Sequence, residues 1–284
     1  MRSLFAAATC AMILAAAPPA AARDEPLWEA GLGIAGITFP AYRGSDQTRG
    51  YVLPAPYLTY RGDLLKSDRH GVRGVFFKRE DVDLHLSVGA SLPVDSSDTP
   101  VREGMPDLKP SVEIGPSLEV TLWRSQDNHT KLDLRLPLRF AFTLESTPRY
   151  IGAQLFPNLN VDVRAPFGFT GWNLGMFAGP VLTNSRYNRY FYEVPQEFAT
   201  ATRPAYGGPG GGYGGMQFLV ALSKRFPGYW IGGFARYDTL QGAVFGDSPL
   251  VTSKHYAAAG IGISWILGRS STRVQVDEFD EARR

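Results

Sequence analysis

The sequence is almost free of cysteine: of its 284 residues, Cys10 alone carries a thiol. Cys10 lies in a run of mostly small apolar residues, 4–17, which follows Arg2 and precedes the alanines 20–22. A basic start, a short apolar run and a small-residue cleavage site predict a secretory signal peptide over 1–22. The mature chain would contain no disulfide, which favours a bacterial envelope over a eukaryotic secretory route.

Several other features are missing. No run of 18 apolar residues follows the predicted signal, so the sequence predicts no transmembrane helix. The formal net charge of +2 gives no electrostatic support for a nucleic-acid partner. Four scattered histidines have no metal-ligand spacing, and no G-x-S-x-G motif occurs. We therefore expect neither a metal nor a cofactor, and no enzyme.

What the sequence does contain is strict alternation. Between residues 132 and 144 it reads L-D-L-R-L-P-L-R-F-A-F-T-L, with an apolar residue at every second position. A period of two is typical of a β-strand, whose successive side chains point to opposite faces. Thirteen residues is long for a soluble domain but suits a tilted strand across a membrane, which needs roughly 9–11 residues. One face would contact lipid and the other a polar lumen.

Similar runs recur along the chain, and no stretch has a sustained helical period. We predict an all-β protein with a single antiparallel transmembrane β-barrel over 23–268. Ten strands are clear: 27–39, 50–60, 82–93, 110–123, 130–145, 150–163, 170–184, 213–225, 229–241 and 254–267. The stretch 63–78 is either one strand or two short ones. Two strands give twelve in all and place the connections 40–49, 94–109, 185–212 and 242–253 on the outer side, so we expect about twelve, with ten as the alternative.

A soluble β-sandwich or lipocalin-like barrel also alternates, but its strands are shorter and its apolar face points inward. Tyrosine and tryptophan residues near the predicted strand ends, such as Trp28, Tyr60, Trp123 and Trp265, fit the aromatic girdles of a membrane barrel. These residues favour the membrane architecture.

The first predicted strand contains G-L-G-I-A-G at 31–36, which matches the dinucleotide fingerprint G-x-G-x-x-G. That fingerprint requires a helix after the glycines, and here Pro40 ends a strand instead. Small residues where neighbouring backbones approach closely explain the pattern better.

The polar faces of two predicted neighbouring strands carry charges of both signs. Glu113 and Glu119 lie on one strand, and Asp133, Arg135 and Arg139 lie on the next. Opposite charges on adjacent strands can pair across the ladder and neutralise a narrow interior. We therefore take these five residues as candidate lumenal charges, in a barrel that is either plugged or a pore.

One long connection has unusual composition. Residues 204–215 read P-A-Y-G-G-P-G-G-G-Y-G-G, and the run 187–192 reads Y-N-R-Y-F-Y. The glycines and prolines predict a flexible loop, the longest on the outer side. Loops of this length are often functional, although many outer loops only cover a barrel mouth.

Segments spread along nearly the whole mature chain resemble the MipA/OmpV family of outer-membrane proteins. They are L-P-A-P-Y-L-T-Y-R-G (53–62), G-P-V-L-T-N-S-R-Y-N-R-Y-F-Y-E-V (179–194), F-A-R-Y-D-T-L-Q-G-A-V-F-G-D-S-P-L-V (234–251), the opening 31–46 and G-I-G-I-S-W (260–265). The resemblance implies a barrel in the bacterial outer membrane, in contact with its lipid. It also implies two partner enzymes, a lytic murein transglycosylase and a penicillin-binding protein, because one member is described as a scaffold joining them. The family has no agreed catalytic residues.

The chain departs from that family at its end. Family members tend to finish with an aromatic residue, whereas here a polar tail, 269–284, follows the last strand. We expect this tail to be a disordered extension, with a docking role as the alternative. For the whole protein we expect a structural scaffold for peptidoglycan-remodelling enzymes; a narrow channel for small solutes is the alternative. The oligomeric state is left open.

Overall fold

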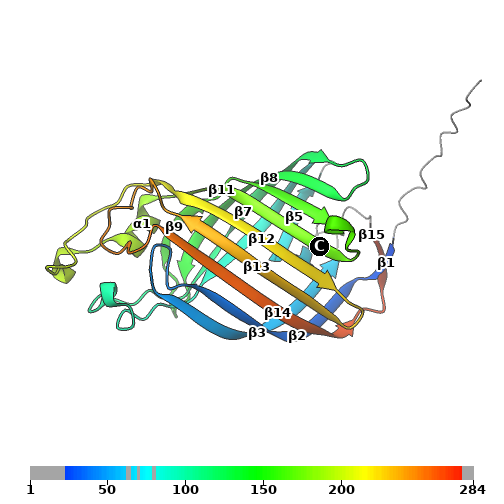
Figure 1. Ribbon diagram of the computed structural model, residues 1–284, viewed down its shortest axis with the longest axis horizontal. Helices are drawn as coiled ribbons and strands as arrows, with labels where there is room; N and C mark the ends of the chain where they lie inside the picture. The colour runs from blue at the N-terminus through cyan, green and yellow to red at the C-terminus, as the bar shows by residue number, and fades with distance from the viewer. Residues whose placement is uncertain (1–22, 62–64, 69–70, 79–80, 277–284) are drawn as a thin grey trace, which may run out of the picture.

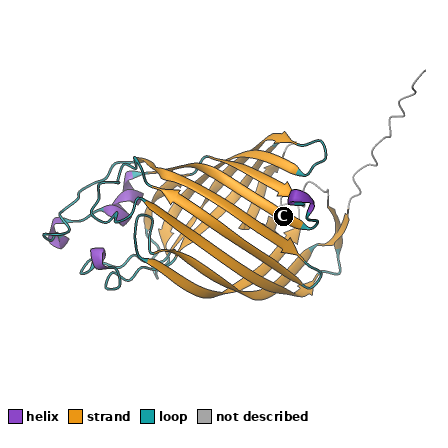
Figure 2. Cartoon of the chain, in the orientation of Figure 1, coloured by secondary structure: helices purple, strands orange, loops and turns teal. Residues whose placement is uncertain are grey.

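The computed structural model describes residues 23–61, 65–68, 71–78 and 81–276. The predicted signal peptide, 1–22, lies outside the described residues. The described chain is built almost wholly from strands (Figure 2). The strands are β1 (Arg23–Pro26), β2 (Trp28–Pro40), β3 (Thr48–Arg61), β4 (Leu65–Asp68), β5 (Gly71–Lys78), β6 (Val82–Ser91), β7 (Ser111–Arg124), β8 (Thr130–Thr143), β9 (Tyr150–Leu155), β10 (Asn158–Arg164), β11 (Trp172–Thr183), β12 (Gly212–Arg225), β13 (Tyr229–Thr239), β14 (His255–Arg269) and β15 (Arg273–Val276).

Thirteen of these strands form one antiparallel sheet, in the order β10-β11-β12-β13-β14-β2-β3-β4-β5-β6-β7-β8-β9. The two ends of this order meet, because β10 also pairs with β8 and β11 also pairs with β9. The short strands β9 and β10 lie one after the other in a single strand position, because both pair with β8 and with β11. The thirteen strands therefore occupy twelve positions round a barrel (Figure 1). The predicted antiparallel barrel of about twelve strands is confirmed.

The stretch 63–78 contains two short strands, as the prediction of twelve requires. Among the described residues, β4 pairs with β3 at Tyr60 and Arg61, and β5 pairs with β6 at residues 83–85. In the same part of the chain, residues 48–57 of β3 and 86–91 of β6 have no strand partner on the sides away from β2 and β7. The described pairing of β3 and β6 with the two short strands between them is therefore brief.

The distribution of side chains is the reverse of that in a soluble protein. On β8, Asp133 is fully buried, whereas Leu138 and Phe140 are exposed on the opposite face. The same pattern holds on the other long strands, whose outward faces carry large exposed apolar residues, among them Leu32, Ile34, Val52, Val220, Ile261 and Leu267. In water such a surface would be costly, because burial of apolar area is the main favourable term in folding. Lipid removes that cost, which is the arrangement of a transmembrane barrel.

The two ends of the barrel differ. The first and last described strands, β1 and β15, pair at one of them, called here the terminal end (Figure 1). The connections at this end are short, for example the turn 226–228. The opposite end, called here the loop end, carries the connections 41–47, 92–110, 144–149, 184–211 and 240–254. The four long connections predicted for one side thus share one end.

The structure corrects three local predictions. The tail 269–284 was expected to be disordered, but β14 includes Arg269 and β15 pairs with β1 in antiparallel register; the rest of the tail, 277–284, lies outside the described residues. The predicted strand 150–163 is divided at Phe156 and Pro157, since proline has no N–H to give to a ladder. The connection 185–212, for which no helix was predicted, contains the helix α1 (Ser185–Tyr192) and the 3-10 turn Gln196–Phe198. The other 3-10 turns are Pro100–Arg102 and Pro166–Gly168.

The glycines of the G-x-G-x-x-G pattern lie within β2, with no helix after them. A Cβ atom placed on Gly31 would lie 2.0 Å from the carbonyl oxygen of Trp265, and one on Gly33 would lie 1.8 Å from that of Ile263. Close approach of β2 and β14 therefore explains these two glycines, as predicted. Gly36 has open space around it, so the explanation does not extend to the third.

Candidate functional site

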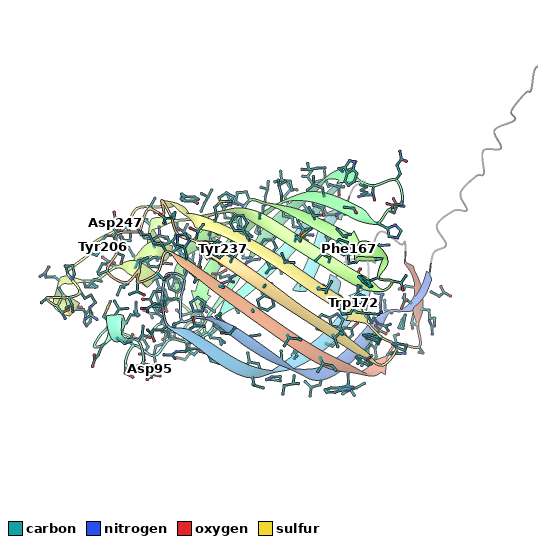
Figure 3. All side chains as sticks on the ribbon, in the orientation of Figure 1. Asp95, Phe167, Trp172, Tyr206, Tyr237 and Asp247 are labelled. Carbon is teal, nitrogen blue, oxygen red and sulfur yellow. The ribbon has the colours of Figure 1, made fainter. Side chains whose placement is uncertain are left out.

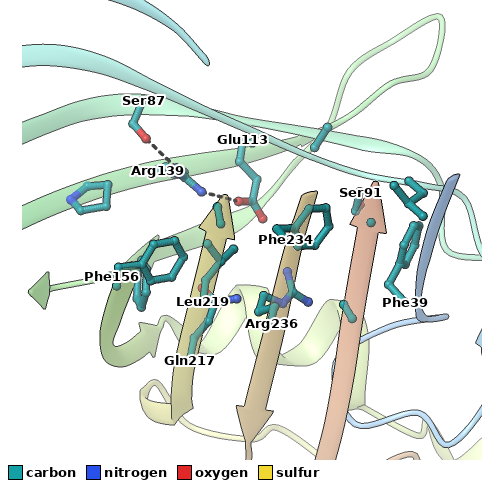
Figure 4. Close-up of a pocket in the computed structure, with 18 of the residues that line it drawn as sticks. Phe39, Ser87, Ser91, Glu113, Arg139, Phe156, Gln217, Leu219, Phe234 and Arg236 are labelled. Carbon is teal, nitrogen blue, oxygen red and sulfur yellow. Dashed lines mark hydrogen bonds and ion pairs between the residues drawn. The ribbon is translucent and has the colours of Figure 1, made fainter. Parts of the chain in front are cut away.

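The barrel encloses a cavity of about 1000 Å³ whose two walls differ in chemistry. Inward-facing residues of β6 to β9 make a polar wall: Ser87, Glu113, Glu119, Arg135, Arg139 and Gln154. Those of β2, β3 and β12 to β14 make a largely apolar wall: Ile37, Phe39, Leu53, Leu219, Phe234 and Ala258. Figure 4 shows Ser87, Arg139 and Glu113 on one side of the cavity and Phe39, Leu219 and Phe234 on the other. Because side chains alternate between the two faces of a strand, every second side chain of each strand points into this cavity.

Glu113 connects the polar wall to the loop end. Its carboxylate accepts a hydrogen bond from the hydroxyl of Tyr187 on α1 at 3.1 Å, and another from the side-chain amide of Gln154. Arg139 lies on the other side, with its Nη1 3.9 Å from the same carboxylate and its Nε donating to the hydroxyl of Ser87 at 2.9 Å. Three neighbouring strands and the helix therefore meet at one buried carboxylate.

A second group of charges lies further toward the terminal end. Lys131 Nζ is 2.8 Å from Glu119 and 2.6 Å from Asp133, and Arg135 is 3.1 Å from Glu119 and 3.3 Å from Asp162. The signs alternate along β8 at Lys131, Asp133 and Arg135, and the strand on each side contributes one carboxylate, Glu119 on β7 and Asp162 on β10. Buried charges require such partners, because an isolated ion loses its hydration without compensation.

The structure places all five candidate lumenal charges inside the barrel wall. Glu113, Glu119, Arg135 and Arg139 line the cavity, and Asp133 is fully buried beside Lys131. Sequence reasoning missed Lys131 and Asp162. Both lie on the same face as the identified charges, so the period of two could have found Lys131 on β8.

The loop end is filled by a structure that we call the mouth plug: α1 together with the loops 41–47 and 240–254. Its buried core includes Tyr42, Tyr187, Phe191, Tyr192 and Phe245. The rings of Tyr192 and Phe245 stack at 3.8 Å with 5° between their planes. Asn184 caps the helix, since its side chain accepts from the backbone N–H of Tyr187 at 2.9 Å.

Hydrogen bonds join the loops of the mouth plug to one another. The hydroxyl of Tyr42 donates to the carbonyl of Leu250 at 2.7 Å, and that of Tyr192 donates to the carbonyl of Arg43 at 3.0 Å. Ser248 donates back to the carbonyl of Tyr192 at 2.7 Å. Burial raises the pKa of Tyr42, Tyr187 and Tyr192, called here the plug tyrosines, well above the ordinary value. All three hydroxyls therefore stay protonated and can donate.

The outermost loops are joined by two buried arginines. Arg102 donates to the carbonyl of Phe191 at 3.3 Å and to that of Pro106 at 3.0 Å. Arg203 donates to the carbonyls of Val101, Glu103 and Phe198 at 2.6–3.1 Å. Guanidinium groups with several N–H donors suit this role, because buried carbonyls need partners. The loop end is thus an ordered, packed structure.

Below the mouth plug, two arginines share one carboxylate. Asp238 on β13 is fully buried, 3.5 Å from Arg43 and 2.8 Å from Arg236 on its own strand. Arg43 Nε also donates to the hydroxyl of Tyr256 at 2.9 Å. Arg236 lines the cavity, on the wall opposite Arg139 (Figure 4).

A fourth group of charges lies at the terminal end of the lumen. Glu29 on β2 is fully buried and forms ion pairs with Arg61 at 3.3 Å, with Arg225, and with Arg269 at 3.4 Å. Arg61 also donates to the carbonyl of Pro26, which ties β3 to β1. Nothing in the sequence spacing indicates this group, because its members come from β2, β3, β12 and β14.

Two features are absent from the described part of the chain. It contains no helix long and apolar enough to cross a membrane. Nor do its described side chains include a group of three or more His, Cys, Asp or Glu residues placed to hold a metal ion. Figure 3 shows where side chains lie along the barrel: Asp95 and Tyr206 are in the loops of the loop end, and Phe167 and Trp172 are near the terminal end.

Comparison with known proteins gives one informative result. No curated protein matches the chain. A solved structure described as "Bacterial polysaccharide outer membrane secretin" is similar at 9% identity with a TM-score of 0.38, over 84% of this chain and 99% of the other. The family model described as "MltA-interacting protein MipA" matches residues 32–267, which is most of the chain and runs from the first half of β2 to two residues before the end of β14. The chain therefore belongs to the MltA-interacting protein MipA family.

Proposed function

We propose that this protein is an outer-membrane barrel that does not form an open channel and serves as a structural partner for peptidoglycan-remodelling enzymes. The observation that carries the proposal is the mouth plug. Its core of stacked aromatic rings and interloop hydrogen bonds fills the loop end, where a general pore would need free passage. The description of the family supports the second part, since it names an interaction with MltA.

In this proposal the terminal end faces the periplasm, because the chain ends of outer-membrane barrels lie there and the longer loops lie outside. The surface offered to a periplasmic enzyme is the β1–β15 pair and the rim around Glu29. Arg225 and Arg269 are partly exposed at this rim, and Arg273 is exposed beside it. A lytic transglycosylase and a penicillin-binding protein are the partners proposed.

Two measurements on the purified chain in lipid test the proposal. In planar bilayers we expect no repeated conductance steps, because the mouth plug blocks ion flow. In a binding assay with a purified lytic transglycosylase we expect saturable binding that weakens when Arg273→Glu reverses a charge at the terminal end. Arg149→Glu, at an exposed position on the loop end, is the matched control. Absence of saturable binding would contradict the scaffold.

A narrow channel for small solutes is the second candidate, and the cavity favours it. Charges of both signs line the lumen, as in a solute pathway. If the bilayer recordings give repeated steps of one size, and these change when Arg139→Gln alters the lining, the channel replaces the scaffold as the proposed function.

A further inference from the structure

The apolar wall of the lumen is unusual for a transmembrane barrel. The interior of such barrels is ordinarily polar, since it contains water or a polar plug. Beyond Glu29, β2 carries apolar residues on both faces: Leu32 and Ile34 point outward, whereas Ile37 and Phe39 point into the cavity. Across the sheet Leu219 and Phe234 continue the inward surface. These side chains are half-buried and line the cavity.

A cationic group adjoins this apolar surface. Arg236 follows Phe234 on the inward face of β13, and 28% of its side chain is exposed. Among the described residues it has one ion pair, formed through Nε with Asp238, which also faces Arg43. One carboxylate thus serves two guanidinium groups. The terminal nitrogens of Arg236 remain available toward the cavity.

We propose that the lumenal cavity binds an anionic amphiphile with a single acyl chain. The chain lies along the apolar wall, and the carboxylate or phosphate group is held by Arg236, with Arg139 facing it from the polar wall (Figure 4). Guanidinium groups bind both kinds of anion through paired N–H donors. The volume of about 1000 Å³ is at the upper end of the range usual for small-molecule sites, roughly 300–1,000 Å³.

The position of the cavity suits a ligand that comes from the membrane. Its lining includes Leu53 and Ala55 of β3 and Ser87 and Ala90 of β6. These residues belong to β3 and β6, between which the two short strands β4 and β5 lie. We place the entry of the acyl chain at this side of the wall, away from the mouth plug. This inference does not depend on the proposed scaffold function.

Photochemical labelling of the full chain in lipid nanodiscs tests the proposal. The probe is dodecanoate with a diazirine near its methyl end, and the labelled residues are identified by mass spectrometry. A lumenal chain labels inward residues such as Ile37 and Phe39, whereas surrounding lipid labels outward residues such as Ile34. We expect excess dodecanoate or dodecyl phosphate to abolish the inward labels, and dodecanol to leave them. The better of the two anionic competitors identifies the head group.

Variants link the labelling to the arginine. Arg236→Gln should weaken inward labelling about tenfold, Arg236→Lys should retain most of it, and Arg149→Gln on the loop end should change nothing, with folding checked by heat-dependent gel mobility. Ala35→Phe, which narrows the cavity without altering a charge, should also reduce it. Labels confined to outward residues, equal competition by dodecanol, or unchanged labelling in folded Arg236→Gln would each overturn the proposal.

Discussion

The stacked rings of Phe245 and Tyr192 allow the stability of the mouth plug to be tested directly. Phe245 is fully buried, stacks on Tyr192 at 3.8 Å and lies in a loop between two barrel strands. Phe245→Ala removes the ring and leaves a cavity in a core that faces water rather than lipid. Such substitutions cost about 3–5 kcal/mol. We expect the substitution to lower the free energy of local opening of the mouth plug and to leave the stability of the barrel unchanged, because this side chain takes no part in the pairing of the barrel strands.

The size of the effect follows from that cost. About 3 kcal/mol raises the population of the open plug by a factor of roughly 100 or more. Hydrogen exchange should report this at the amides of Asn188 and Glu193, which donate within α1 to Asn184 and Arg189 at 3.1 Å. Amides in the barrel strands should keep their protection. In planar bilayers the variant should also show conductance that the unaltered chain lacks.

Val244→Ala is the matched control, since Val244 is the preceding residue and 40% exposed. It should change protection in α1 by less than about threefold, because surface substitutions usually fall within ±0.5 kcal/mol. If Phe245→Ala leaves exchange in α1 unchanged, or if both variants behave alike, the stack does not hold the plug closed and the reasoning is refuted.

Three further predictions concern the wall and the plug. Lys131→Met leaves Glu119 without its closest partner and should lower the free energy of unfolding, measured by urea unfolding from vesicles, by about 3–5 kcal/mol. Adding Glu119→Gln to this variant should restore part of the loss. If the single and the double variant are equally stable, the ion pair does not carry the effect. Gly33→Ala should abolish barrel assembly, measured by heat-dependent gel mobility, because the added Cβ would lie 1.8 Å from a backbone oxygen. Gly36→Ala in the same strand has open space for its Cβ and should assemble normally. Burial raises the pKa of the plug tyrosines above 10, so the folded plug retains protons that the unfolded loops release; its stability is therefore complete below about pH 10 and declines as the pH rises further. Tyrosinate absorbance that appears in one step near pH 10, with the plug intact, would contradict this.

The alternation in the sequence was enough to predict the barrel, because the period of two within a single strand already separates a lipid-facing side from a lumen-facing side. The run 132–144 shows this: its leucines and phenylalanines point outward, and Asp133, Arg135 and Arg139 point inward. The strand count depended on 63–78, where two short strands pair with each other and only briefly with their neighbours.

The helix α1 was missed because its apolar residues do not follow a long helical period. Its eight residues are stabilised by the Asn184 cap and by burial of Tyr187, Phe191 and Tyr192 among loops that are distant in sequence. Propensity over so short a segment is weak, so the tertiary environment decides. The tail was misjudged for a similar reason, since β15 needs β1 from the other end of the chain to form a pair.

The sequence by itself therefore determined the class of fold and which face of each strand is apolar, because the alternation of a barrel strand is local and visible within that strand. The tertiary structure alone decided what fills the lumen. Glu29 meets three arginines from three other strands, Asp238 meets Arg43 from a loop, and Glu113 meets Tyr187 from α1. These contacts join residues up to 240 positions apart, and no local pattern encodes them, since they arise only when the barrel brings its strands and loops together.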